Sequence, residues 1–444
     1  MNAPILRLSL LLCLFVSSSV FAQNKPGLPY HSKDASVGVV NCASSLCHGS
    51  ITEWKDSNIL QNEYVTWSRF DKHARAYDVL LNEKSQSIAR KFGLSAPPQK
   101  SKLCLDCHAH NVPEVKRGER FKLSDGVTCE ACHGPAARWL SSHVEPRATH
   151  ASNIQQGLYP TSKPMERAQL CLSCHFGNKD KFVSHRLMGA GHPRMSFELE
   201  TFSTISPAHV RIDKDYEKRK QVWDGVKVWA IGQSLAVAET MDILRDPKRG
   251  RDGLFPELVL FDCHACHRPM SEQRWKPTTA FGASPGTGLA RLNDSGMLMM
   301  RAIAKQMDPQ LGARVTAQGG KLHRAVAGQG DAMAEAAEMQ RLSLEVANRI
   351  ENYSFSESAL RGIALSLIDD GLNGYYRDYA GAEQAVMAIG SVVNFMNKRG
   401  MIKSVKPVNA ALQKLYASLS NDEKYRPAEF QQRLREFKNV LLAQ

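Results

Sequence analysis

The sequence contains no apolar run long enough to span a membrane, few strand patterns and, beyond residue 290, no cysteine. A membrane-spanning helix needs about 20 predominantly apolar residues, and the longest run, at residues 8–15, is much shorter. Residues 41–200 are rich in glycine, proline and polar turns, a composition that does not favour a sheet. These absences exclude an integral membrane span after signal removal and confine any cysteine chemistry to the first two thirds of the chain.

The N-terminus has the pattern of a secretory signal. Residues 1–22 contain one basic residue, Arg7, followed by an apolar stretch and a small-residue ending at Ala22. This order predicts cleavage after Ala22 and export to the periplasm. An uncleaved signal would instead anchor the chain, and a lipid on Cys13 is disfavoured by the bulky Leu12 before it. Cleavage removes Cys13 and leaves ten of the eleven cysteines.

These ten cysteines form five close pairs, and a histidine directly follows the second cysteine of each pair. Four pairs read CLDCH, CEACH, CLSCH and CHACH, the C-x-x-C-H motif of c-type haem attachment. The thiols bond to the haem vinyl groups, and the histidine binds the iron as proximal ligand. The predicted attachment residues are Cys42, Cys47, Cys104, Cys107, Cys129, Cys132, Cys171, Cys174, Cys263 and Cys266, and the predicted proximal ligands are His48, His108, His133, His175 and His267.

The first pair departs from the motif, because four residues separate Cys42 from Cys47 in CASSLCH. A longer spacer can loop out and still bring both sulfurs to the vinyl groups, so we predict a fifth haem c here. A single disulfide between Cys42 and Cys47 is the alternative, since disulfides are the default in an exported chain. Zinc held by cysteine pairs would not require a histidine after every second cysteine.

A haem iron has a second axial position, which another histidine or a methionine can fill. No methionine lies in an evident ligand motif, so we favour bis-histidine ligation. About half of the spare histidines are then expected to bind iron, and the others to be surface or structural residues. The histidines outside the motifs are His31, His73, His110, His143, His150, His185, His192, His209, His264 and His323.

Several stretches match one family together. They read CASSLCHGS, TWSRFDKHARAY, KLCLDCHAH, DGVTCEACHGPAARWLSSH and QLCLSCHFGN, and further on MGAGHPRMSFELETFS and PELVLFDCHACHRP. In order and spacing the chain resembles cytochrome c554 and the multihaem cytochromes of the hydroxylamine oxidoreductase superfamily, from about Cys42 to Met270. The resemblance implies a loop-rich module of short helices around stacked haems.

The resemblance also implies which histidines cap which iron. His73 would cap the iron of His133, His143 that of His48, and His185 or His192 that of His175. The family pattern leaves the second iron, that of His108, without a distal ligand. This chain departs from that pattern by its expanded first motif, its fifth motif and its long C-terminal region. With further histidines at hand, the predicted distal ligands are His73, His143, His185, His192 and His209.

The chain divides into a signal at 1–22, a multihaem domain at 23–275 and an α-helical domain at 290–444. Residues 215–246 predict one long helix whose Trp229 fills a core or lies against a haem, and 277–288 predict a linker. Helical periodicity recurs near 331–350, 358–370, 382–398, 408–419 and 427–442. The methionines near residue 299 are interpreted as core and not as copper ligands, and His323 as structural with a distal-ligand role as the alternative. The fold class is mainly α.

The formal net charge of +13 is by itself compatible with nucleic-acid binding. Five haems would bring about ten propionates, and with one positive charge per ferric haem the total falls to about +7 after signal removal. Much of the lysine and arginine excess is therefore interpreted as propionate partners. Any remaining basic surface would steer an acidic redox partner. Together with export, this argues against nucleic acid.

We therefore expect an exported pentahaem c-type cytochrome that transfers electrons by Fe(III)/Fe(II) cycling. The expected partners are redox proteins, a membrane quinol oxidase or a terminal reductase, in anaerobic respiration. The alternative is a reductase of a small nitrogen or sulfur oxide at one open haem. A third interpretation makes 290–444 a docking region, whose deletion would leave the spectra intact and abolish reduction of the partner.

Overall fold

The structure, a computed structural model, describes residues 27–55, 57–251, 254–267, 280–282 and 291–444. The predicted signal peptide and most of the predicted linker at 277–288 lie outside these residues. In the described part there is no β-strand, only two isolated bridges, which join Ser36 to Arg117 and Phe261 to Leu292. The predicted mainly α class is confirmed.

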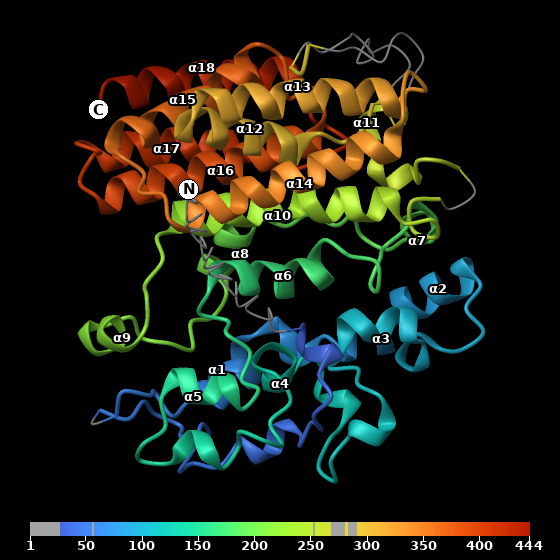
Figure 1. Cartoon of the computed structure of the whole chain (residues 1–444), viewed down its shortest axis with the longest axis vertical. Helices are drawn as coiled ribbons and strands as arrows, with labels where there is room; N and C mark the ends of the chain where they lie inside the picture. Colours follow the sequence, from blue (N-terminus) through green and yellow to red (C-terminus); the bar gives the residue numbers. More distant parts are fainter. Residues whose placement is uncertain (1–26, 56, 252–253, 268–279, 283–290) are drawn as a thin grey trace, which may run out of the picture.

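The molecule has a loop-rich part with short helices below a stack of long helices (Figure 1). The short helices carry four of the five cysteine motifs and are separated by turns, as the glycine- and proline-rich sequence predicts. Their bounds are α1 Glu63–Phe70, α2 Glu83–Phe92, α3 Lys102–His108, α4 Cys129–His133, α5 His150–Gln155, α6 Pro164–His175, α7 His185–Gly189, α8 Leu199–Ile205, α9 Lys214–Arg219 and α11 Cys263–Cys266. The long helix α10 Gly225–Arg245 lies between this part and the stack (Figure 1).

The stack of long helices contains the five helices expected from periodicity and two that were not expected. The two additional helices are α12 Ser295–Met307 and α13 Pro309–Val326. The expected ones are α14 Ala332–Glu351, α15 Glu357–Leu372, α16 Tyr379–Lys398, α17 Val405–Ala417 and α18 Pro427–Leu442. The predicted apolar stripe of α18 is buried throughout its length, and the methionines of α12 are core residues as predicted.

The single long helix predicted at 215–246 is wrong, because the structure has α9 and α10 with a break between them. Asp224 ends the break by accepting a 2.7 Å hydrogen bond from the Lys227 N–H. Aspartate is a preferred N-cap residue, so it starts a new helix instead of continuing the old one. Trp229 of α10 has no exposed surface and belongs to the core, as the core interpretation predicts.

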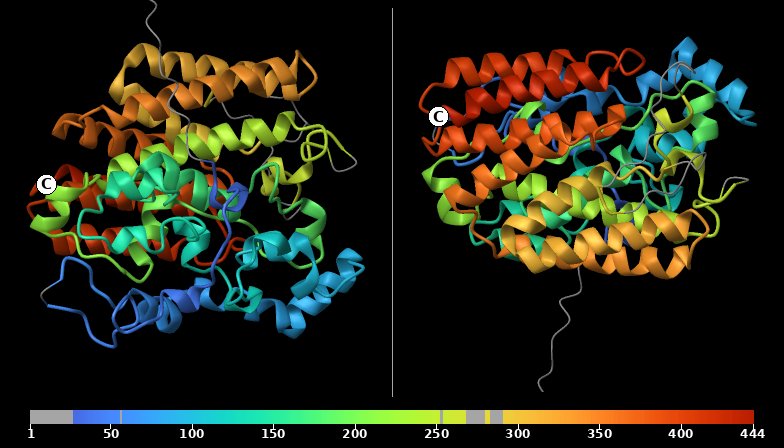
Figure 2. Two further views of the ribbon diagram at one scale, coloured as in Figure 1. Left: turned by 60° about the horizontal axis from the view of Figure 1, so that its bottom comes forward. Right: turned by 90° about the horizontal axis from the view of Figure 1, so that it is seen from above.

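One hydrophobic core joins the two parts of the molecule. Helix α10 packs against α14 on one side and against α6 and α8 on the other, which the further views in Figure 2 also show. Buried residues of α6, α8 and α10 share a cluster with those of α12–α18. The helix that carries the fourth motif therefore belongs to the same core as the C-terminal helices.

Glu239 on α10 makes this core sensitive to pH. Burial, and then the nearby Asp242 carboxylate, raise the pKa of Glu239 to about 7. Because the unfolded value is about 4.3, the unfolded chain loses this proton first, and stability falls as the pH rises from about 4.5 to 7. Glu239→Gln is expected to raise the free energy of unfolding at pH 8 by about 1–2 kcal/mol, allowing for partial exposure.

Denaturant unfolding between pH 4.5 and 8 checks this expectation. The exposed Glu217 on α9 provides the matched control, and Glu217→Gln should leave the pH profile unchanged. A Glu239→Gln profile parallel to that of the unmodified protein would contradict the prediction.

Candidate haem-binding site

Helical turns present four of the five cysteine motifs. The CEACH motif is the whole of α4, and the motifs of α3 and α6 form the last turn of each helix. In a helix, residues three apart lie on one face, so both thiols of C-x-x-C point to the same side. In the fifth motif the His267 N–H donates to the Cys263 carbonyl at 2.8 Å. This bond holds the histidine beside the first cysteine.

The expanded motif CASSLCH keeps the same closing bond without a helix. The His48 N–H donates to the Cys42 carbonyl at 3.2 Å, while the Cys47 and Gly49 N–H groups both donate to the Ser44 carbonyl. The extra residues bulge outwards, and Leu46 is 76% exposed. The two additional residues thus leave the relation between the first cysteine and the histidine as it is in the other motifs.

Four motif histidines each face a second histidine from a distant part of the chain. The ring centroids are 6.3 Å apart for His48 and His143, 5.8 Å for His175 and His73, 6.3 Å for His133 and His209, and 6.1 Å for His267 and His185. A metal–imidazole bond is about 2 Å long and the ring centre lies about 1 Å further, so two trans imidazoles on one metal place their centroids about 6 Å apart. The four pairs fit an iron between the rings.

These neighbours agree with the implied crossings in one case and differ in the others. His143 lies beside His48, as the resemblance implies. His73, expected opposite His133, instead faces His175, and His209 takes the place beside His133. His185, expected near His175, faces His267. The cause is long-range: α8 and the segment after it carry His209 back to α4, a path that local sequence does not specify.

The second motif has no such partner ring. Among the described residues no histidine ring makes a stacking contact with His108, whose Nδ1 lies 3.0 Å from the Ala76 carbonyl oxygen. His192 lies close enough for His108 to affect its pKa. Burial is the main cause that lowers the pKa of His192, and the charge of His108 lowers it further. His192 is therefore the candidate for the distal position at this motif.

Five of these ten histidines are oriented through Nδ1. Nδ1 of His48 lies 2.9 Å from Glu63 Oε2, and Nδ1 of His73 lies 2.9 Å from Asp71 Oδ1. Nδ1 of His108, His143 and His192 lies within 3.1 Å of a backbone carbonyl oxygen. An Nδ1–H donor directs the Nε2 lone pair outwards, as in histidines that bind a metal. The hydrogen bond that His48 donates to the Glu63 carboxylate also raises the pKa of His48 above its usual value.

The remaining spare histidines contact protein groups instead. Nε2 of His31, His110, His150 and His323 approaches Asp180, Ser36, Ser162 and Asp294, respectively. His264 Nδ1 accepts the Tyr379 N–H at 3.0 Å, and its ring stacks on Tyr425. These rings are structural in the described fold. The structural interpretation of His323 is thereby supported by a contact 3.3 Å long.

The attachment cysteines of different sites lie close enough to shift one another's pKa. We number the sites by their motifs along the chain. The neighbouring Cys129 of the third site lowers the pKa of Cys42 in the first. Cys174 of the fourth site raises the pKa of Cys107 in the second, and its Sγ lies 3.9 Å from the Asp106 carbonyl oxygen inside the second motif. Burial, and then Cys171 and Cys174, raise the pKa of Cys132 to about 12, so the third and fourth sites adjoin.

The fifth site is held by the C-terminal helices. Asp262, directly before the motif, donates its N–H to the Arg291 carbonyl at 2.8 Å and caps α11 through the His264 N–H. Burial, and then the Asp378 carboxylate, raise the pKa of Asp262 to about 7. Arg291 bridges this cluster to Asp294 and Asp378. The fifth motif therefore depends on residues that follow it in the chain.

Buried donors beside the motifs test whether haem fits these sites. Thr128 Oγ1, Trp139 Nε1 and Arg167 Nε are buried and have no hydrogen-bond partner among the described residues. Thr128 directly precedes the third motif, and Arg167 lies on α6. The Trp139 carbonyl oxygen lies 3.1 Å from His143 Nδ1. Carboxylates such as haem propionates accept hydrogen bonds from groups of this kind. The donor set fits the cofactor.

The sequence interpretation missed the polar residues that position the site. Glu130, inside CEACH, is fully buried and accepts N–H bonds from Val37, Gly38 and Ala136 at 2.7–2.9 Å. It thereby fastens the segment before the first motif to α4. Glu63 and Asp71 were missed as well. In the sequence, the only sign of such a role was the position of Glu130 between the two cysteines of its motif.

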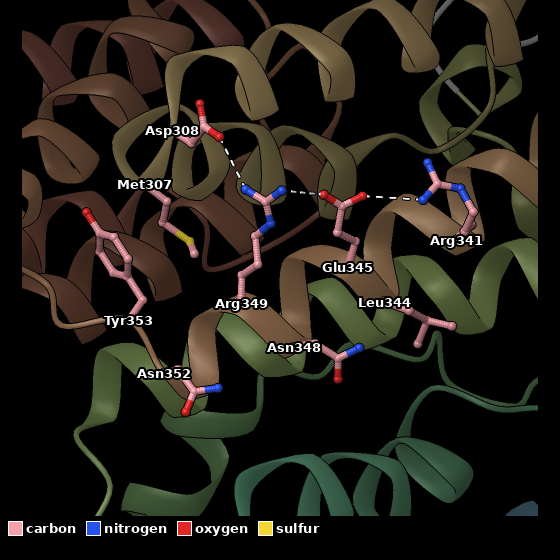
Figure 3. A pocket seen from close by; sticks show the side chains of 9 residues that line it. All are labelled: Met307, Asp308, Arg341, Leu344, Glu345, Asn348, Arg349, Asn352 and Tyr353. Atoms are coloured by element: carbon pink, nitrogen blue, oxygen red, sulfur yellow. Dashed lines mark hydrogen bonds and ion pairs between the residues drawn. The ribbon is translucent and has the colours of Figure 1, made fainter. Parts of the chain in front are cut away.

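A separate surface hollow lies away from the motifs, beside α14 (Figure 3). Arg341 and Arg349 flank it, and both approach the Glu345 carboxylate between them. Arg349 also reaches Asp308 at 3.2 Å. These charges satisfy one another, so the hollow offers little free charge to a ligand.

None of the helices in the described part of the chain combines the length and apolar character that crossing a bilayer requires. Comparison with curated proteins and with solved structures gave no significant match. Residues 41–134 match the family described as cytochrome c554 and c-prime. This segment contains the first three motifs and the histidines at 48, 73, 108 and 133. This part of the chain is thus similar to cytochrome c554, and the similarity supports a c-type cytochrome that binds haem c and has a role in electron transfer.

Proposed function

We propose that the protein is an exported pentahaem cytochrome in which electrons pass along a continuous row of five haems. The observation that carries the proposal is the set of four histidine pairs with centroids 5.8–6.3 Å apart, each containing one motif histidine. The haem supplies the one-electron chemistry when bound, and the chain supplies orientation and electrostatics. His48 and His73 gain basicity from Glu63 and Asp71.

The mutual pKa effects of the cysteines support an order for the row. The first site adjoins the third, the third adjoins the fourth, and the fourth adjoins the second. The fifth site is joined to the second through α7, which begins at His185 and ends shortly before His192. Electrons would enter or leave at the first and fifth sites, the two ends of this row. The redox partners, a quinol oxidase and a terminal reductase, are proposed to dock there.

The mass of the purified exported protein tests the haem count. We expect the chain from residue 23 plus five haem c groups. Substituting both Cys42 and Cys47 by alanine should remove one haem and leave four. The matched control substitutes Cys104 and Cys107 in a regular motif and should also leave four. If the Cys42/Cys47 variant kept the mass increment of the unmodified protein, CASSLCH would not attach haem.

A second candidate function rests on the second site. His108 lacks the opposing ring that the other four motif histidines have among the described residues. An iron there with an open position would bind and reduce a small nitrogen or sulfur oxide, with the other haems supplying electrons. Carbon monoxide added to the reduced protein distinguishes the two functions: a shift of about one haem in five supports the reductase, and no shift leaves an electron carrier.

A further inference from the structure

Lys181 lies where three of the haem motifs meet. Its Nζ is 3.2 Å from the Cys174 Sγ of the fourth motif. Its positive charge also lowers, behind larger effects, the pKa of Cys107 in the second motif and of Cys132 in the third. The row proposed above passes through these motifs in the order third, fourth, second, so Lys181 stands at its centre.

The surrounding loop holds the lysine in this position. Nζ lies 3.9 Å from the centre of the Tyr30 ring, a cation–π contact. Asn178 accepts the Lys181 N–H through its side chain at 3.0 Å, donates its own N–H to the Lys181 carbonyl at 2.7 Å and donates its amide to the Tyr30 hydroxyl at 2.9 Å. The lysine is half-buried. A long side chain fixed by a ring and a closed loop does not explore solvent freely.

We infer that Lys181 is a positioning residue that raises the reduction potentials of the haems at the second and fourth sites. The inference rests on the proposed attachment of haem at these motifs. Reduction adds an electron to the haem, and a fixed positive charge beside an attachment cysteine stabilises the reduced form more than the oxidised form. The effect is larger in this half-buried place than at the surface, because less water screens the charge. The centre of the row then holds electrons more strongly than it would without the lysine.

Lys181→Met tests the inference through an optical redox titration of the full-length holoprotein. One or two of the five reduction steps should move to lower potential, while the remaining steps keep their positions. Lys181→Arg keeps the charge and should give a smaller shift. Lys179 provides the control, since it lies two residues earlier, is 51% exposed and pairs with Asp242 at 3.0 Å. Lys179→Met should leave the titration unchanged.

Three results overturn the inference. They are a Lys181→Met curve that superimposes on that of the unmodified protein, a Lys181→Arg shift as large as that of methionine, and an equal shift in Lys179→Met. The haem mass of each protein is measured alongside. If Lys181→Met loses haem, the same redox titration is carried out on Lys181→Gln, whose polar side chain has a similar length, and its result decides whether the inference holds. If the unmodified protein lacks haem at the second or fourth motif, the proposed function fails instead.

Discussion

A chain that ends at residue 289 is expected to unfold instead of giving a smaller cytochrome. Removing α12–α18 would expose the faces of α10 that pack against α12, α14 and α16, and on α10 both Trp229 and Ile231 are fully buried in the intact chain. Each large apolar side chain contributes about 1.5–3 kcal/mol by burial. Four or five of them match the entire stability of a typical domain, about 5–15 kcal/mol. The fifth site would also lose Arg291, which holds Asp262.

Circular dichroism, thermal unfolding and haem mass measure this outcome. A point variant isolates the cause: Trp229→Ala should cost about 3–5 kcal/mol and lower the melting temperature, whereas Trp54→Ala, at a residue 40% exposed, should cost little. If the truncated chain kept all five haems and melted like the full protein, residues 290–444 would be a separate docking module. Loss of the fifth haem alone would show that the boundary lies between the fourth and fifth motifs.

The C-terminal helices show why periodicity predicted some elements and missed others. Helix α18 has one apolar face, so its stripe is visible in the sequence. Helix α12 is buried on most sides, with Met297–Met300 all in the core, so no single face is apparent. Helix α13 contains Gly319 and Gly320, residues that normally lower helix propensity. A Cβ at either would come within 2.5 Å of Phe281, so close packing explains both glycines.

The haem motifs are readable from sequence because their chemistry is local. Two thiols and a histidine within five to seven residues define a site whatever the fold around them. The distal partners are not local. Sequence reasoning selected His73 and His209 as ligands, but their partners depend on how α6, α8 and α4 meet in space, which is a property of the tertiary packing. Lys181 and Glu130 carry no motif, and their roles appear only once distant segments are brought together.

Replacing any of the four paired distal histidines is expected to convert one iron from low spin to high spin. Alanine in place of His209, His185, His143 or His73 would leave the iron bound by the opposing motif histidine without its sixth ligand. The ferric protein should then gain a high-spin electron paramagnetic resonance signal, and the reduced protein should bind carbon monoxide at about one more haem in five. His150, which contacts Ser162, provides the control, and His150→Ala should leave both spectra unchanged.

A double variant decides between the two possible crossings of His73. In the structure His73 faces His175 while His209 faces His133, so removing both histidines should open two irons. If His73 instead capped the iron of His133, as the family resemblance implies, and His209 bound no iron, the double variant would open only one. Carbon monoxide titration counts the open irons directly. A count of one would overturn the pairing seen in the structure while leaving haem attachment intact, because the attachment cysteines are unchanged.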